Sequence, residues 1–118
     1  MSKYGNKKVE IDGYKFDSIK ESEKYLELKF LKQHKQIKDF EVHPSFVIFD
    51  GYVNKQGQKI RPIIYTADFR VVELDNSEEI LDIKPYIRSK QKYFLTAVFK
   101  LKVKLFEARY PHLTLAIE

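Results

Sequence analysis

Two strand-like segments that carry charges among apolar residues, 64–69 and 80–84, constrain the fold of this chain most strongly. The polar run at residues 75–78 has turn composition, so we predict that residues 60–74 and 79–84 form an antiparallel hairpin. Asp68 and Asp82 each lie seven residues from Asp75, which places them opposite each other with Cβ atoms about 5 Å apart. Lys84 follows Asp82 by two positions and therefore lies on the same face of the sheet.

Two helices are expected on either side of these strands. Ser18 and Glu21 have capping-box spacing, which predicts a helix that begins at residues 17–18 and runs to about residue 36. A second helix begins between residues 89 and 96, after Pro85, and runs to about residue 109. Projection at 3.6 residues per turn puts Glu21 on the apolar side of the first helix. The other residues of that arc are Ile19, Tyr25, Leu26, Leu28 and Phe30.

The expected strands cover residues 9–11, 14–16, 40–49, 60–74, 79–84 and 113–117, with a polar loop at residues 51–59. Asp12-Gly13 is a strong hairpin turn, and Pro44 implies an edge or a bulge. The last strand–helix–strand unit should be a right-handed parallel crossover. We therefore predict one α/β domain over residues 1–118. It consists of a basic N-terminal arm or hairpin at 1–16 and a core at 17–118, in the order α-β-β-β-α-β.

Composition limits the classes of function. The 118 residues include 22 Lys and Arg against 17 Asp and Glu, a net charge of +5 that favours phosphate polymers or anionic membranes as partners. Cysteine is absent, which excludes disulfides, thiolate zinc sites and cysteine nucleophiles. His34, His43 and His112 lack ligand spacing, and we interpret His43 and His112 as structural. No apolar run approaches a membrane span, so we expect a soluble, cytoplasmic protein without membrane contacts.

The charged strand residues suit phosphodiester chemistry. Magnesium takes carboxylate and water oxygens, and Asp68 with Asp82 can share one ion. The Lys84 ammonium can orient the attacking water, stabilise phosphorane charge or act as a base. Glu21 is either a further ligand or the capping partner of Ser18, and both roles can hold if its carboxylate is shared. Lys102 lies within the apolar arc of the second helix, where it either snorkels to solvent or serves the active site.

This arrangement resembles the PD-(D/E)xK nuclease superfamily, with an acid on one strand and the Asp82-Ile83-Lys84 motif on the next. The chain is similar, over nearly its whole length, to a family of small phage-encoded, Holliday-junction-resolvase-like endonucleases. The matching residues are Ser2-Lys3-Tyr4, Lys7-Lys8-Val9, Phe16-Asp17-Ser18 with Glu21, Tyr65-Thr66-Ala67-Asp68-Phe69, Asp82-Ile83-Lys84, and Thr96 with Lys102. Two features depart from that pattern: Pro85 replaces the usual glycine, and the stretch at 86–95 is longer than is typical.

The resemblance implies a restriction-endonuclease-like fold and a Mg²⁺-dependent DNA endonuclease, with Mn²⁺ as a substitute ion. Asp68, Asp82, Glu21 and the backbone carbonyl of Ile83 would hold the metal. The expected substrate is branched, four-way DNA in phage recombination or replication, cut to leave a 5′-phosphate in the host cytoplasm. Two symmetric incisions would need a homodimer, because each active site makes one cut.

Several basic side chains are candidate DNA backbone contacts or simple solvated charges: Lys7, Lys8, Lys55, Lys59, Arg61, Arg88, Lys90 and Lys92. Tyr4, Tyr86 and Tyr93 can stack on unpaired bases or close the core. The tripeptide Glu27-Leu28-Lys29 also matches the (D/E)xK pattern, but inside a helix. Two alternatives stay open. One is a non-catalytic DNA-binding or interaction protein on a nuclease scaffold, and the other is a restriction-type or packaging-type nuclease.

Overall fold

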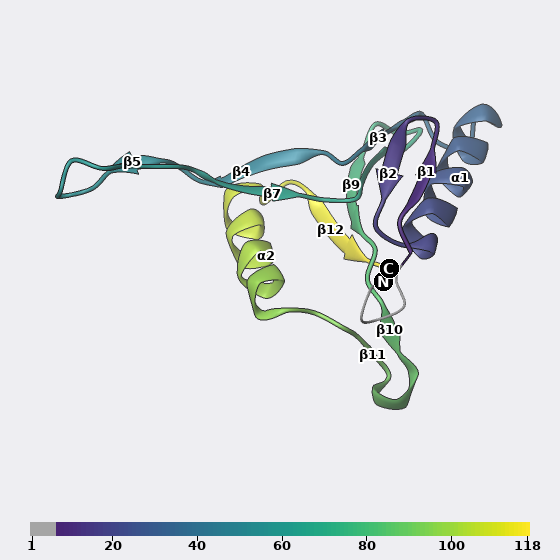
Figure 1. Cartoon of the computed structure of the whole chain (residues 1–118). Coiled ribbons are helices and arrows are strands. Elements are labelled where there is room, and N and C mark those ends of the chain that lie inside the picture. The colour runs from purple at the N-terminus through teal and green to yellow at the C-terminus, as the bar shows by residue number, and fades with distance from the viewer. Residues whose placement is uncertain (1–6) are drawn as a thin grey trace.

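The computed structural model describes residues 7–118, so Tyr4 lies outside the described part of the chain. Figure 1 shows two helices packed around strands from which two hairpins project. The elements are β1 (Val9–Ile11), β2 (Tyr14–Phe16), α1 (Ile19–Gln33), β3 (Asp39–Val42), β4 (Ser45–Phe49), β5 (Tyr52–Val53), β6 (Lys59–Ile60), β7 (Ile63–Thr66), β8 (Phe69–Val72), β9 (Glu78–Asp82), β10 (Tyr86–Ile87), a 3₁₀ turn (Arg88–Lys90), β11 (Lys92–Tyr93), α2 (Ala97–Arg109) and β12 (Thr114–Ile117).

The central sheet has the strand order β12-β9-β8-β3 and is mixed, as predicted. β8 pairs with β9 antiparallel in the expected register, from Val72 opposite Glu78 to Phe69 opposite Leu81. One further step along this register brings Asp68 opposite Asp82, and the Asp68 N–H donates to the Leu81 carbonyl at 3.1 Å. β12 pairs with β9 in parallel after the α2 connection, which confirms the parallel crossover.

Two segments predicted as single strands are divided between different sheets, residues 40–49 between two and residues 60–74 among three, and this is a correction to the sequence analysis. Residues 40–49 form β3 and β4, separated at His43, whose φ of +54° is left-handed. Residues 60–74 form β6, β7 and β8, and β7 ends just before Asp68. The two breaks face each other: the His43 N–H donates to the Asp68 carbonyl at 2.9 Å, and the Ala67 N–H donates to the Pro44 carbonyl at 3.0 Å. Both strands therefore leave the central sheet together.

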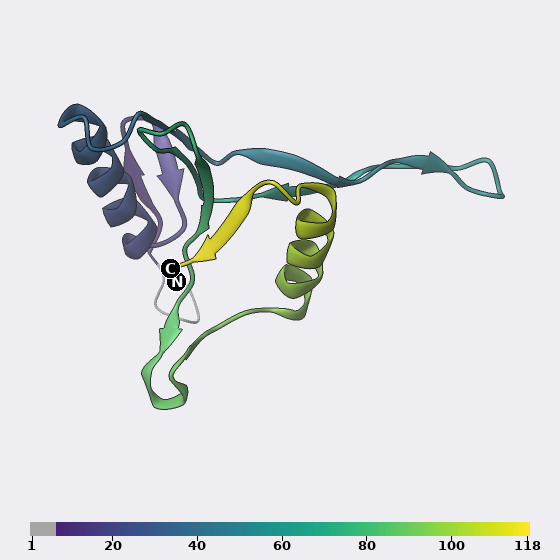
Figure 2. The same ribbon diagram turned by 180° about the vertical axis from the view of Figure 1, so that it is seen from behind.

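The strands that leave the central sheet form a long hairpin over residues 45–66. β4 pairs with β7, and β5 pairs with β6 further out. The polar loop expected at residues 51–59 is thus wrong, because only residues 54–58 form the turn at the tip. Asn54 stabilises that turn by accepting hydrogen bonds on its side-chain oxygen from the Gln56 and Gln58 N–H groups at 3.0 and 2.9 Å. Figure 2 shows the long hairpin extending well away from the central sheet.

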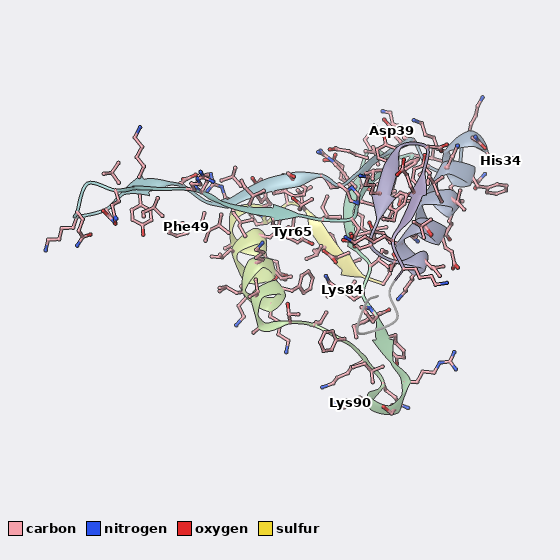
Figure 3. The ribbon with its side chains drawn as sticks, viewed as in Figure 1. His34, Asp39, Phe49, Tyr65, Lys84 and Lys90 are labelled. Atoms are coloured by element: carbon pink, nitrogen blue, oxygen red, sulfur yellow. The ribbon has the colours of Figure 1, made fainter. Side chains whose placement is uncertain are left out.

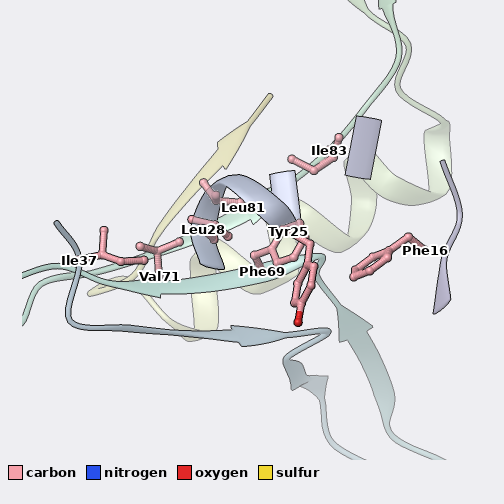
Figure 4. Close-up of a cluster of buried hydrophobic side chains, with 8 residues drawn as sticks. All are labelled: Phe16, Tyr25, Leu28, Ile37, Phe69, Val71, Leu81 and Ile83. Atoms are coloured by element: carbon pink, nitrogen blue, oxygen red, sulfur yellow. The ribbon is translucent and has the colours of Figure 1, made fainter. Parts of the chain in front are cut away.

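The first helix packs against the central sheet through a narrower apolar stripe than predicted. Ser18 caps it as expected, and its hydroxyl accepts from the Glu21 N–H at 3.1 Å. Tyr25 and Leu28 are buried, in the cluster shown in Figure 4. The predicted arc is wrong at Ile19, Leu26 and Phe30, which are exposed. The helix ends at Gln33 rather than near residue 36, because Lys35 adopts a left-handed φ of +58°.

The second helix lies beneath the base of the long hairpin and caps a second core cluster. Thr96 begins it by accepting from the Phe99 N–H at 3.1 Å, and it ends at Arg109 as predicted. Phe99 and Phe106 pack there against Phe46 and Tyr65 of the long hairpin. The fold is therefore mixed α/β, with two helices and a mixed sheet. Neither helix within residues 7–118 is long and apolar enough to cross a lipid bilayer.

Candidate metal centre

Three parts of the fold meet at the end of β9: the first turn of α1, the break between β3 and β4, and the break between β7 and β8. Each contributes one side chain to what we call the acidic group, namely Glu21, His43 and Asp68. One possible ligand atom from each residue lies within 4.8 Å of the others. Two carboxylates and an imidazole thus surround one point, an arrangement that can hold a divalent cation.

Glu21 reaches this point because helical periodicity places it on the buried side of α1, as predicted. It is only 4% exposed. Its Oε2 accepts from the Asp17 N–H at 3.4 Å, one residue before the Ser18 cap, while Oε1 lies 2.9 Å from His43 Nε2. The carboxylate is therefore shared between the helix start and the acidic group.

His43 was interpreted as structural, and sequence reasoning missed its position. Its left-handed backbone and the Pro44 that follows turn the chain out of the central sheet, which leaves the imidazole next to Glu21. No sequence signal links these two residues, which lie 22 positions apart. A histidine held in an uncommon backbone conformation beside two acids is a reason to look for function, because such conformations concentrate at functional sites.

Asp68 is partly buried near the carboxylates of Asp82 and Glu21. Burial raises its pKa to about 8, and the nearby charges of Asp82 and Glu21 act in the same direction. The Ile83 N–H donates to Asp68 Oδ2 at 2.6 Å and partly opposes this effect. A bound cation would relieve the same electrostatic cost, because it would favour the ionised carboxylate.

Asp82 lies in a second cluster, which we call the paired group: Tyr65, Asp82 and Lys84. The buried Tyr65 hydroxyl donates to Asp82 Oδ2 at 2.5 Å, and Lys84 Nζ lies 2.9 Å from Oδ1. Burial and the adjacent Asp82 raise the pKa of the Tyr65 hydroxyl, so it serves as a donor. Lys84 also lies over the Phe99 ring, with its Nζ 4.1 Å from the centroid. Tyr65 was predicted only as part of the strand motif, without this contact.

Both clusters contribute side chains to one pocket with a volume of about 250 Å³, whereas His43, Tyr65 and Asp82 are not among its lining residues. Glu21, Asp68, Ile83 and Lys84 line it together with Lys20, whose Nζ donates to the Lys84 carbonyl at 2.8 Å. A larger pocket of about 610 Å³ lies between β2, α1 and β3, but contains neither cluster. We place the candidate site in the smaller pocket because the carboxylates of Glu21 and Asp68 and the ammonium of Lys84 line it together.

The other predicted residues lie elsewhere. Lys102 Nζ donates to the Ile64 carbonyl at 3.3 Å and thus ties α2 to the long hairpin. In the alternative tripeptide on α1, Glu27 pairs with Lys24 at 2.8 Å and Lys29 pairs with Asp12 at 2.7 Å, so both charges are engaged on the surface. The candidate DNA contacts are all exposed and lie in three places: before β1 (Lys7, Lys8), on the long hairpin (Lys55, Lys59, Arg61) and on the β10–β11 hairpin (Arg88, Lys90, Lys92).

The fold and site define a mixed α/β domain with a candidate metal centre. The chain belongs to the protein family described as "Protein of unknown function (DUF1064)", whose family model matches residues 1–118. Searches of curated proteins and of solved structures find no match. The function therefore has to be inferred from the side chains of the candidate site and their geometry.

Proposed function

We propose that this protein is a metal-dependent DNA endonuclease that hydrolyses phosphodiester bonds on a restriction-endonuclease-like fold. The observation that carries the proposal is that Glu21 and Asp68 of the acidic group line one pocket together with Lys84. Mg²⁺, or Mn²⁺ in its place, would polarise a phosphoryl oxygen and lower the pKa of a bound water. The resemblance of the Asp82-Ile83-Lys84 motif to PD-(D/E)xK nucleases supports the same reaction class.

The donor set fits a hard or borderline divalent cation. Glu21 and Asp68 supply carboxylate oxygens, and His43 supplies a nitrogen that Mn²⁺ accepts. Burial, together with the nearby charges of Asp82 and Glu21, raises the pKa of Asp68, so the negative charge of its ionised form is destabilised here. A divalent ion would balance it, whereas the paired group already has Lys84 beside Asp82.

The remaining side chains have separate tasks in this proposal. Asp82 fixes the Lys84 ammonium at the edge of the pocket, where it can stabilise charge that develops on the phosphate. Tyr65 holds the Asp82 carboxylate in place by hydrogen bonding. Lys20 lines the same pocket and adds a positive charge that attracts the DNA backbone.

We also propose branched DNA as the substrate and a homodimer as the active form, following the family resemblance. A resolvase makes two symmetric incisions, so it needs two sites related by a two-fold axis. Val98 and Leu101 of α2 are 63% and 57% exposed, and Phe49 and Val53 of the long hairpin are exposed as well. Sedimentation equilibrium of the whole chain tests the dimer, and a purely monomeric species at micromolar concentration would contradict it.

A cleavage panel tests the activity. Linear duplex, single-stranded, flapped and four-way DNA are incubated under one Mg²⁺ or Mn²⁺ condition with the wild type and with Asp68→Asn. We expect cleavage by the wild type and a loss of at least about 10³-fold in the variant. Glu27→Gln, which changes the acid of the unrelated tripeptide on α1, is the matched control and should cut normally. Equal cutting by Asp68→Asn and the wild type would refute the proposal. The panel also separates a junction-specific enzyme from a restriction-type or packaging-type nuclease.

A second candidate is a non-catalytic DNA-binding protein on the same scaffold. One observation favours it: Asp82 already has both oxygens occupied, by Tyr65 and Lys84, and so needs no metal. Calorimetry separates the two candidates, because an active site should bind Mn²⁺ and lose it in Asp68→Asn. A bare scaffold would bind no ion in either protein.

A further inference from the structure

The β10–β11 hairpin, residues 86–93, carries aromatic side chains that do not belong to the core. Tyr86 pairs with Tyr93 across its two strands, and their rings lie 5.1 Å apart at 71°. Tyr86 is 50% exposed, and neither tyrosine is a member of the two buried clusters. Figure 3 shows this hairpin leaving the body close to Lys84, with Lys90 at its far end. Core closure, the usual role of such tyrosines, therefore does not explain them.

A pocket of about 470 Å³ lies along this hairpin and continues to the start of α2. Its walls combine aromatic rings with positive charges: Tyr86, Tyr93, Phe94, Lys90, Lys92 and Lys100. Within residues 7–118 none of these three lysines forms an ion pair, whereas Lys24, Lys29 and Lys32 on α1 each pair with an acid. Rings beside unpaired cations are the combination that binds a nucleobase and its phosphate.

The hairpin pocket and the metal pocket have different lining residues, but two contacts link one lining to the other. Lys20 lines the metal pocket, and its Nζ lies 5.1 Å from the centroid of the Tyr93 ring. Pro85 also lines the metal pocket, and its carbonyl accepts from the Phe94 N–H at 2.8 Å. Tyr86 follows Lys84 by two residues, so their Cα atoms lie within about 7.6 Å of each other. A nucleotide on the hairpin would thus be a close neighbour of a phosphate in the metal pocket.

We propose that the β10–β11 hairpin binds an unpaired nucleotide of the DNA strand whose scissile phosphate lies in the metal pocket. The base stacks on the exposed face of Tyr86, and Lys90, Lys92 and Lys100 contact the flanking phosphates. A continuous duplex cannot present a base in this way, since its bases are stacked inside the helix. The hairpin therefore selects DNA with unpaired nucleotides next to the cut. This inference rests on the proposed nuclease function and specifies its substrate.

The test measures binding without cleavage. Fluorescence anisotropy in EDTA compares a duplex that carries a short single-stranded flap with a continuous duplex of the same length. We expect Tyr86→Ala to weaken binding to flapped DNA about tenfold and to leave duplex binding within twofold. Tyr86→Phe should bind as the wild type does, because the phenyl ring still stacks. Tyr52→Ala on the long hairpin is the matched control, with 53% exposure against 50%, and should not change the ratio of the two affinities.

The outcomes separate this inference from the nuclease proposal. An equal effect of Tyr86→Ala on both DNAs, or no effect on either, overturns the hairpin assignment and leaves the metal site untouched. A tenfold selective loss combined with normal cleavage by Asp68→Asn supports the hairpin and refutes the metal site. Lys90→Gln with Lys92→Gln provides a second check: the salt dependence of binding to flapped DNA should become shallower by about two phosphate contacts. An unchanged salt dependence would contradict the lysine contacts.

Discussion

Asp68, just before β8, and Asp82, at the end of β9, lie opposite each other at the same end of the sheet, yet the regions around them balance charge in different ways. The acidic group brings a second carboxylate, Glu21, and an imidazole toward Asp68. The paired group brings a hydroxyl donor and an ammonium to Asp82. Burial first, and then the charges of Asp82 and Glu21, raise the pKa of Asp68 to about 8. Both residues are aspartates of the predicted motif, but Asp82 has a cationic partner in Lys84, whereas Asp68 lies near two further carboxylates.

This difference indicates a division of labour. A cation added to the acidic group would meet unbalanced negative charge, whereas a cation at Asp82 would have to displace Lys84 or Tyr65. We therefore expect Asp68 to dominate metal binding and Asp82 to act mainly by orienting Lys84. The strand pairing alone suggests that the two aspartates share one ion equally. Unequal roles would instead give the two aspartate variants different effects on metal binding and on stability.

The largest expected effect is on Mn²⁺ affinity, measured by isothermal titration calorimetry. Asp68→Asn should weaken binding by more than about 100-fold, because it removes a direct ligand. Asp82→Asn should weaken it by only about tenfold, since outer-shell changes are typically milder. The opposite ranking of the two variants would show that the comparison is wrong.

Stability of the metal-free protein should change in opposite directions. Asp82→Asn removes the ionic partner of Lys84, whose side chain is largely buried. We expect the free energy of unfolding to fall by about 2 kcal/mol. Asp68→Asn removes a carboxylate that burial and neighbouring charges destabilise, so the free energy of unfolding at pH 8 should rise. Urea denaturation with EDTA measures both values. A loss of stability in both variants would mean that Asp68 is already balanced.

The pH dependence of stability should also identify Asp68. Its pKa rises from 3.8 in the unfolded chain to about 8 in the folded protein, so the folded state holds the proton more tightly. The free energy of unfolding should therefore fall as pH rises from about 4 to about 8, by up to about 1.4 kcal/mol per pH unit, and level off above this range. Asp68→Asn should lose this slope, as should the wild type saturated with Mn²⁺. Identical profiles for the wild type and the variant, both without metal, would exclude Asp68 as the source.

The smallest effect concerns the helix start that positions Glu21. Ser18→Ala should lower the free energy of unfolding by about 1 kcal/mol and weaken Mn²⁺ binding by no more than about threefold. Thr96→Ala removes the equivalent cap of α2, a helix that carries no member of the acidic group, and is the matched control. It should reduce stability similarly and leave Mn²⁺ affinity unchanged. If Thr96→Ala also lowered the Mn²⁺ affinity, the effect of Ser18→Ala on Mn²⁺ binding would be due to general destabilisation and not to the position of Glu21.

The parts of the site that follow local rules could be predicted from the sequence. The turn at residues 75–78 fixes the register of β8 and β9, and with it the position of Asp68 opposite Asp82. Helical periodicity and the Ser18 cap place Glu21 on the buried side of α1. These features depend on residues close together in the chain, so propensity and spacing suffice.

The parts that depend on tertiary pairing were not predictable. Residues 40–49 and 60–74 have continuous β-strand character, and nothing local marks the change of sheet at Ala67 and Asp68. The proximity of His43 to Glu21 arises only once β3 and α1 lie side by side. Tyr52 pairs with Ile60 only because β4 and β7 already align the chain, so residues 51–59 resemble a loop in isolation. The exposure of Leu26 and Phe30 likewise depends on how α1 sits on the sheet.

The paired exit of β4 and β7 from the central sheet has a mechanical consequence. The long hairpin joins the body at His43-Pro44 and Ala67-Asp68, so two members of the acidic group also serve as its attachment points. Any rotation of that projection changes backbone torsions at these same residues and shifts their side chains relative to Glu21. A displacement of the hairpin tip would therefore reach the candidate metal site through the backbone of His43 and Asp68.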